Sequence, residues 1–177
     1  SLKSKLCLNG SKMLYEYCNK YDIQYKKCGK LVVSTNEEES VKIKEIYQNA
    51  LQSGVVCIEL LEQEEIRAVE PGIFALNAIY SKETGIIDVH KLMEKLFINS
   101  TENGAVFAFS NEVKAIKKAK NGYILVYGDG EEVLSDFVIN CAGLYSDCIA
   151  KMAGFDIDKS GYKLAFCKGD YFKISSR

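Results

Sequence analysis

The segment VINCAGLYSD, residues Val138 to Asp147, decides the fold of this sequence. It starts like the end of a buried strand, continues with the small residues Cys141, Ala142 and Gly143, and ends like the first turn of a helix. Small residues after a strand serve either a tight turn alone or a turn whose backbone lies close to a bound phosphate or nucleotide. The residues of this segment leave both interpretations open.

Strand-like runs surround this turn. Four of them follow one another before it, at residues 105–110, 111–120, 122–129 and 131–140. The pair Asn121-Gly122 favours a type I′ hairpin turn between the second and third runs, and Gly128–Gly130 marks the next turn. After the turn we expect a helix over Leu144–Gly154 and a final strand over residues 162–174.

The N-terminal part of the sequence combines helical and strand patterns. Apolar residues spaced three and four apart predict a helix over residues 3–20. Asn36 and Asp88 are placed to cap two further helices, which Gly54 and Gly104 end. Their predicted core sides are Val41, Ile46, Tyr47, Ala50 and Leu51 in the first, and Val89, Leu92, Met93, Leu96 and Phe97 in the second. Strand-like runs lie at residues 28–35, 57–61 and 74–81, and a short helical run lies at 62–72. This mixture predicts an α/β fold with mixed α+β character.

Composition and charge exclude several classes of partner. The chain has 177 residues with a formal net charge of −1, and arginine occurs only at Arg67 and Arg177, so we expect no nucleic-acid interface. No apolar run has the length of a membrane span, so we expect no transmembrane segment. The seven cysteines are irregularly spaced and form no C-x-x-C pair, which argues against a disulfide framework and against a metal site. A cytoplasmic protein fits these thiols best.

The motifs of several common enzyme classes are absent from the sequence. It has no G-x-G-x-x-G and no Walker loop, and its one G-x-G, Gly128–Gly130, reads as a hairpin turn. The single histidine, His90, lies near the start of a predicted helix without an adjacent carboxylate or cysteine partner. We therefore interpret His90 as a surface or supporting residue and expect no Ser-His-Asp triad on this chain.

Six separated segments together resemble the D-amino-acid-oxidase-like superfamily of FAD-dependent oxidoreductases, and the L-2-hydroxyglutarate dehydrogenase-like branch matches best. In family order they are SLKSKLCLNGSKMLYEYC, KCGKLVVST, TGIIDVHKLM, NGAVFAFSNEV, VINCAGLYSD and CKGDYF. The resemblance extends over essentially the whole chain but only over the middle of the family's length. We therefore expect an internal piece of a longer protein.

The resemblance implies two interleaved domains, one that binds FAD and one that holds the substrate. It assigns residues 1–20 to a helix of the FAD-binding domain, 21–85 to the substrate domain, 86–158 to the second half of the FAD-binding domain and 159–177 to a substrate-domain strand. The family's G-x-G-x-x-G and its histidine-containing segment beside the flavin belong upstream of Ser1. Catalytic residues are therefore expected there.

The resemblance also assigns binding residues to this chain. Val113 takes the place where the family's backbone meets the adenine ring, and the turn that passes close to FAD is Cys141, Ala142 and Gly143. This favours the second interpretation of the opening segment, a backbone that approaches a cofactor. The candidates for substrate contact are Lys168, Tyr171 and Lys30.

The function that the resemblance implies is oxidation of a small 2-hydroxy acid, most of all L-2-hydroxyglutarate, to the 2-oxo acid by hydride transfer to FAD. The electron acceptor is unknown. A FAD-dependent glycerol-3-phosphate dehydrogenase is an alternative, because such sequences share this general layout. An alternative of another class is a non-catalytic binding module that lacks the cofactor half.

Overall fold

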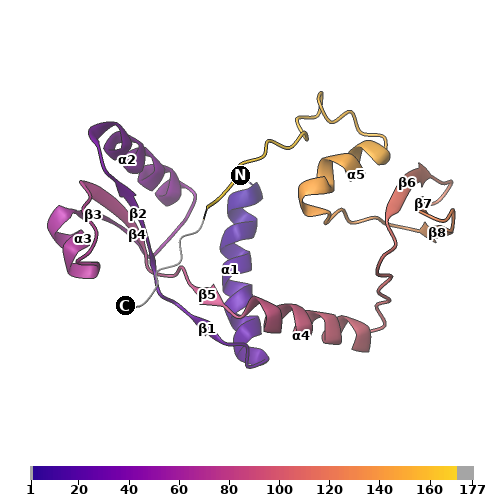
Figure 1. The fold of residues 1–177 in the computed structure, drawn as a ribbon, viewed down its shortest axis with the longest axis horizontal. Helices are drawn as coiled ribbons and strands as arrows, with labels where there is room; N and C mark the ends of the chain where they lie inside the picture. The colour runs from indigo at the N-terminus through magenta and orange to yellow at the C-terminus, as the bar shows by residue number, and fades with distance from the viewer. Residues whose placement is uncertain (1, 171–177) are drawn as a thin grey trace. The chain divides into compact units, whose positions relative to one another are not determined.

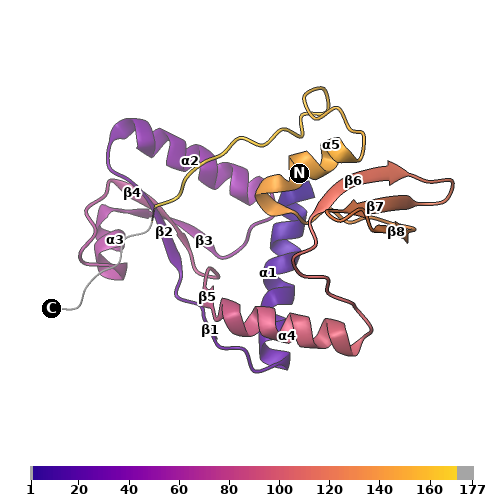
Figure 2. The ribbon, with the colours of Figure 1, turned by 45° about the vertical axis from the view of Figure 1, so that its right-hand side comes forward.

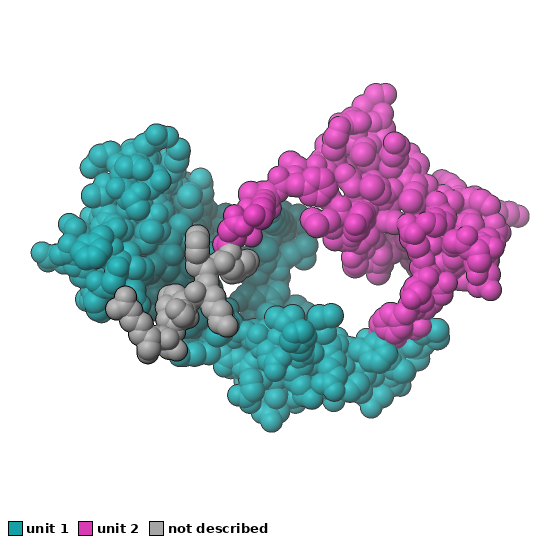
Figure 3. Space-filling model, in the orientation of Figure 1, with its two compact units in different colours: residues 1–106 teal, residues 107–177 magenta. Residues whose placement is uncertain are grey.

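The computed structural model describes residues 2–170 and divides the chain into two compact units, residues 1–106 and residues 107–177 (Figure 3). Both units combine helices with antiparallel strands, which confirms the predicted mixed α/β class. The first unit contains, in order (Figure 1), α1 (Leu2–Lys20), β1 (Tyr25–Lys26), β2 (Lys30–Ser34), α2 (Glu37–Gln52), β3 (Ile58–Glu62), α3 (Gln63–Val69), β4 (Asn77–Ser81), β5 (Ile86–Ile87) and α4 (Val89–Glu102). The second contains β6 (Val113–Lys118), β7 (Tyr123–Tyr127), β8 (Glu132–Ser135), a 3-10 turn η1 (Gly143–Tyr145) and α5 (Ser146–Met152).

A three-stranded antiparallel sheet forms the centre of the first unit, in the order β2-β4-β3. Ala78 at its middle pairs with Val33 on one side and Leu61 on the other. Ile66 of α3 packs on this face and is fully buried. Neighbouring strand residues point to opposite faces, so Asn77 faces the other side, where it meets α2. The sheet is therefore covered by α3 on one face and by α2 on the other.

A buried polar group joins α2 to this sheet. The Ser34 hydroxyl donates to Oδ1 of Asn77 at 2.7 Å, and Nδ2 of Asn77 donates to the Ser40 hydroxyl oxygen at 2.5 Å. All three residues are buried. Because each side chain has a hydrogen-bond partner, these bonds offset the cost of removing the polar atoms from water.

The helix ends follow the signals in the sequence. Asn36 accepts a hydrogen bond from the N–H of Glu39 at 2.9 Å, and Asp88 accepts one from the N–H of Lys91 at 2.9 Å, so both predicted caps are confirmed. Gly54 and Gly104 follow α2 and α4 with φ of +82° and +87°, the left-handed conformation that favours glycine after a helix.

Helices α1 and α4 meet beside the short antiparallel pair β1 and β5 (Figure 2). The amide of Asn99 in α4 donates to the Tyr17 hydroxyl of α1 at 2.8 Å. The end of α1 buries Cys18, and Ile23 after it is also buried. The predicted apolar face of the first helix is therefore confirmed near its C-terminal end, whereas Leu6 and Met13 earlier on it are exposed.

Strands β6, β7 and β8 form an antiparallel meander in the second unit. Helix α5 packs against β6, where Ile116 is buried. The predicted hairpin between β6 and β7 is confirmed, but its predicted type I′ turn is wrong. That turn needs positive φ at both central residues, and among the described residues Gly122 has it (φ +88°) while Asn121 does not.

Two predicted strands do not form within the described residues, and a third ends early. Residues 105–110 and 162–170 carry no strand, and the run predicted over 131–140 forms β8 only over Glu132–Ser135. Val106, Ile139 and Phe166 in these segments are exposed. The rest of the last predicted strand, residues 171–174, lies outside the described residues. An apolar run predicts that a segment can join a sheet, but a strand also needs a neighbour that pairs with its backbone.

The predicted core sides of α2 and α4 are only partly covered. Helix α2 buries Ser40 and Ile43, and of its predicted core residues Tyr47 and Ala50 are half-buried, whereas Val41, Ile46 and Leu51 are exposed. The bond between Asn77 and Ser40 holds α2 against the sheet, and Ser40 lies on the helix surface beside the predicted apolar face. On α4 the exposed residues are Val89, Met93, Leu96 and Phe97, and Leu92 is half-buried. Periodicity marks an apolar face on a helix but does not say that another layer covers it.

Candidate functional site

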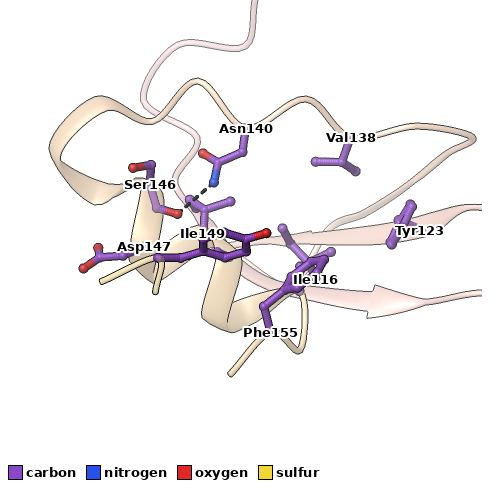
Figure 4. Close-up of a pocket in the computed structure, with 11 residues that line it drawn as sticks. Ile116, Tyr123, Val138, Asn140, Ser146, Asp147, Ile149 and Phe155 are labelled. Atoms are coloured by element: carbon purple, nitrogen blue, oxygen red, sulfur yellow. Dashed lines mark hydrogen bonds between the residues drawn. The ribbon is translucent and has the colours of Figure 1, made fainter. Parts of the chain in front are cut away.

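The segment from Asn140 to Ser146 is a turn held by one side-chain amide. Oδ1 of Asn140 accepts a hydrogen bond from the N–H of Ala142 at 3.2 Å, and its Nδ2 donates to the carbonyl oxygen of Ser146 at 2.8 Å (Figure 4). Within the turn, the N–H of Tyr145 donates to the carbonyl of Ala142 at 3.0 Å. Asn140 thus ties the start of the turn to the start of α5.

A small pocket of about 180 Å³ lies beside this turn. Val113 of β6 lines it together with Cys141 and Ala142 of the turn, and its further walls include Leu125, Val138 and Ile139. Three of the four residues that were predicted to bind cofactor therefore lie around one mostly apolar pocket.

A β-bulge lies next to Val113. Val113 pairs with Tyr127 and Ala115 pairs with Val126, so Lys114 is an extra residue on β6. A bulge bends its strand and turns the neighbouring side chains. Val113 is half-buried at this position and lines the pocket.

Gly143, the fourth predicted residue, does not line that pocket but begins η1 beside it. Its φ is +56°, in the left-handed region where a side chain is strained. A Cβ placed on it would meet no heavy atom within 4 Å in the described part of the chain. Its backbone conformation, rather than crowding by this chain, therefore accounts for the glycine, and the space beside it is open.

A larger pocket of about 460 Å³ adjoins the small one, with Ile116, Val138, Asn140 and Ile149 on the border of both. Figure 4 shows Ile116 and Tyr123 on the strands and Ile149 on α5 around it. Asn140 is the polar side chain that the two pockets share.

Asp147, the second residue of α5, links this region to the segment that follows the helix. Its Oδ2 accepts a hydrogen bond from the N–H of Leu164 at 3.3 Å, and its Oδ1 accepts one from the N–H of Cys148 at 2.8 Å. The Leu164 bond, then the Cys148 bond, hold the pKa of the Asp147 carboxyl below its ordinary value of 3.8, because both stabilise the charged form.

The predicted substrate residues are not brought together within one unit. Lys168 belongs to the second unit, where its ammonium lies 2.8 Å from Oδ1 of Asp170 and is exposed. Lys30 begins β2 of the first unit, pairs with Ser81 and is exposed. Tyr171 lies outside the described residues. The substrate roles of these residues stay predictions.

Asn140 and Asp147 were part of the segment that decided the fold, but no role was predicted for either side chain. Asparagine and aspartate commonly accept hydrogen bonds from backbone N–H groups one to three residues ahead, and that preference was the available signal. That preference does not identify Ser146 and Leu164 as partners. The geometry of the turn determines the bond from Asn140 to Ser146, and the tertiary structure determines the bond from Leu164 to Asp147.

Other reactive side chains form no second site in the described residues. His90 is exposed on the first turn of α4, as predicted for a surface histidine. The cysteines of the described part are free thiols, with Cys18 buried and the others exposed. Residues 2–170 hold no group of three His, Cys, Asp or Glu residues that could bind a metal ion. Nor does that range contain a helix long and apolar enough to cross a membrane.

Named proteins resemble this chain along nearly all of its length. The mitochondrial L-2-hydroxyglutarate dehydrogenase of Homo sapiens is 37% identical over 185 residues, covering 98% of this chain and 39% of that protein. The mitochondrial enzyme of the same name from Dictyostelium discoideum is 36% identical over 169 residues, covering 86% of this chain and 38% of that protein. The L-2-hydroxyglutarate dehydrogenase of Escherichia coli K12 is 29% identical, covering 99% and 40%. The chain thus spans about two fifths of the length of these relatives.

Solved structures share its fold at low sequence identity. The L-alpha-glycerophosphate oxidase of Mycoplasma pneumoniae, solved with FAD bound, matches with a TM-score of 0.72 and 22% identity, over 86% of this chain and 42% of that one. The L-proline dehydrogenase of P. horikoshii matches with a TM-score of 0.70 and 20% identity, over 84% and 40%. At this identity the likeness concerns the fold alone.

The family model described as FAD dependent oxidoreductase matches residues 1–177. Since that match extends over the whole chain, it agrees with the family predicted from the six sequence segments, and it makes FAD the family's cofactor. The chain belongs to the family of FAD-dependent oxidoreductases.

Proposed function

We propose that this chain is part of an enzyme that oxidises L-2-hydroxyglutarate to its 2-oxo acid with FAD as hydride acceptor. The observation that carries the proposal is the 37% identity, over 98% of this chain, to a protein named L-2-hydroxyglutarate dehydrogenase. Relatives of the same name from Dictyostelium discoideum and Escherichia coli support it. The name of the human relative describes that protein as mitochondrial, whereas our prediction for this protein stays a cytoplasmic location.

The residues of the second unit are chemically suited to FAD. The pocket beside Val113, Cys141 and Ala142 is mostly apolar, so it would exclude water from a flat ring. Gly143 leaves open space beside its backbone, where a Cβ would otherwise project. We propose that these four residues hold part of the cofactor. FAD, when bound, supplies the two-electron acceptor that the reaction needs.

Lysines would recognise the substrate's carboxylates. A dicarboxylate needs cationic partners, and this chain has Lys168 and Lys30 as the predicted candidates, with Tyr171 as a hydrogen-bond donor. Lys168 already pairs with Asp170, so a substrate carboxylate would compete with that exposed ion pair. Exposed ion pairs contribute little to stability, so exchanging one for a substrate contact costs little.

The predicted division into domains stays part of this proposal. Residues 1–20 and 86–158 would belong to the FAD-binding half, and residues 21–85 and 159–177 to the substrate half. The sheet β2-β4-β3 between α2 and α3 falls within residues 21–85, which supports their treatment as one segment. The candidate cofactor turn falls within residues 86–158.

The test uses the complete protein loaded with FAD and an artificial dye as electron acceptor. We expect kcat/KM for L-2-hydroxyglutarate to exceed those for its D enantiomer and for glycerol 3-phosphate by at least about tenfold, since selective enzymes distinguish substrates through several polar contacts. A preference for glycerol 3-phosphate would favour the alternative dehydrogenase. Failure to bind FAD, together with no turnover, would favour the non-catalytic module.

A further inference from the structure

The side-chain amide of Asn140 accepts one hydrogen bond through its oxygen and donates another through its nitrogen. The Ala142 N–H can only donate and the Ser146 carbonyl can only accept, so the partners themselves fix the oxygen toward Ala142 and the nitrogen toward Ser146. A carboxylate of the same shape would keep the first bond but would place an oxygen against the Ser146 carbonyl. The site therefore requires an amide, which is a chemical requirement beyond space-filling.

The two bonds enclose the residues of the candidate cofactor turn. Cys141, Ala142 and Gly143 lie between the two ends that Asn140 joins, and Figure 4 shows its side chain directed at Ser146 where α5 begins. Gly143 has a left-handed backbone and no heavy atom within 4 Å of its Cβ position in the described chain, so packing around it does little to hold the turn. Among the described residues, Asn140 provides the side-chain hydrogen bonds of the turn, beside the backbone bond from Tyr145 to Ala142.

We propose that Asn140 is a positioning residue for FAD: its amide holds the backbone of Ala142 and Gly143 in the conformation that receives the cofactor. This inference rests on the proposed function, because it takes the cofactor beside this turn to be FAD. It concerns binding of FAD and not the choice of substrate. A preorganised turn spends less conformational entropy on binding than one that must be ordered by the ligand.

The experiment compares Asn140→Asp and Asn140→Ala in the complete protein with Asn121→Asp, which makes the same amide-to-carboxylate change in the β6–β7 turn of the same unit. The readouts are the Kd for FAD from flavin fluorescence, the visible spectrum of the bound flavin and the melting temperature of the apoprotein. At about pH 8 we expect each Asn140 variant to bind FAD about three- to tenfold more weakly, as loss of a hydrogen bond predicts. The Asn121 variant should bind as the unchanged protein does.

Protonation provides a rescue that depends on the hydrogen bonds of residue 140 and not on its packing volume, and the melting temperature of the apoprotein separates positioning of the turn from stability of the fold. In the Asn140→Asp variant, the introduced carboxyl can, when neutral, again donate to Ser146 and accept from Ala142, and the Ser146 carbonyl that faces it favours this neutral form. Lowering the pH from about 8 to about 5 should therefore restore FAD binding partly in Asn140→Asp but not in Asn140→Ala.

Three results would overturn the role of Asn140. They are FAD binding at the unchanged strength in Asn140→Asp, an equal pH response of the Asp and Ala variants, and loss of the folded apoprotein in both, which would make the amide purely structural. Failure of the proposed substrate looks different, because the unchanged protein would then bind FAD without oxidising L-2-hydroxyglutarate. An unchanged complete protein that binds no FAD would contradict both proposals.

Discussion

The carboxylate of Asp147 accepts a hydrogen bond from the backbone N–H of Leu164 at 3.3 Å. Asp147 directly follows Ser146, to which Asn140 is bonded, and Leu164 leads along the chain toward Lys168. One side chain thus joins the candidate cofactor turn to the segment that carries a candidate substrate residue. Asp147 therefore links the proposed FAD site to the segment of Lys168, the proposed substrate residue of the second unit.

The ionisation of Asp147 should make stability depend on pH. Its pKa is lowered in the folded protein, so its contribution is present above the ordinary value of 3.8 and is lost as the pH falls through the lower folded value. We expect the protein to melt at a higher temperature than an Asp147→Asn variant at neutral pH, and this difference to shrink below about pH 4. Thermal melts across this range measure it, with Asp136→Asn as the control for loss of a charge. A difference that stays constant into acid would refute the assignment.

The buried contact between Asn77 and Ser40 should show strong energetic coupling. Asn77→Ala removes partners from two buried hydroxyls, and Ser40→Ala leaves a buried N–H without an acceptor, so each should cost roughly 1–3 kcal/mol of unfolding free energy. The double variant should cost less than the sum, because it removes both ends of one bond. Urea unfolding of the four proteins in this cycle measures the coupling. Strictly additive losses would show that the contact contributes nothing.

Gly29 and Gly54 allow backbone strain to be separated from crowding. Both have left-handed backbones, with φ of +74° and +82°. A Cβ on Gly29 would lie 2.6 Å from Cε2 of Tyr80, whereas a Cβ on Gly54 would meet nothing within 4 Å in the described residues. Gly54→Ala should cost about 1 kcal/mol through strain, and Gly29→Ala roughly 1–3 kcal/mol more. Equal losses in denaturant unfolding would show that the ring of Tyr80 moves aside freely.

Lys168 should affect substrate binding without affecting the cofactor. Lys168→Met removes the charge that we propose for a substrate carboxylate, so KM for L-2-hydroxyglutarate should rise about tenfold or more while the Kd for FAD stays unchanged. Lys163→Met is the matched control, because Lys163 is an exposed lysine of the same segment whose ammonium lies 3.2 Å from Oδ1 of Asp158. Steady-state kinetics of the complete protein measure both. An equal KM in the two variants would remove Lys168 from the substrate site.

Local signals in the sequence predicted the elements well where the cause is local. Asn36 and Asp88 cap α2 and α4 because a side-chain oxygen can reach the first free N–H groups of its own helix. The type of the β6–β7 turn was missed, because Asn121 can adopt either sign of φ and the register of the hairpin decides which one.

Properties that depend on distant partners could not be predicted in the same way. Residues 105–110 and 138–140 have the composition of strands, but strand formation needs a paired neighbour. The exposed side of α4 is apolar, and periodicity cannot show what covers it. Around the candidate site, Val113, Cys141 and Ala142 were identified through family resemblance. The bonds of Asn140 became visible only with the geometry of the turn.

The most direct test of the account is the Kd for FAD of the complete protein carrying Gly143→Ala, beside Gly154→Ala. Both glycines lie in the second unit with left-handed backbones, at φ of +56° and +90°, and neither Cβ position has a neighbour within 4 Å in the described chain. The two substitutions therefore impose a similar backbone strain of about 1 kcal/mol. If the turn receives FAD, Gly143→Ala should raise the Kd about tenfold or more while Gly154→Ala leaves it unchanged. Equal FAD binding by the two variants would contradict a cofactor beside Gly143.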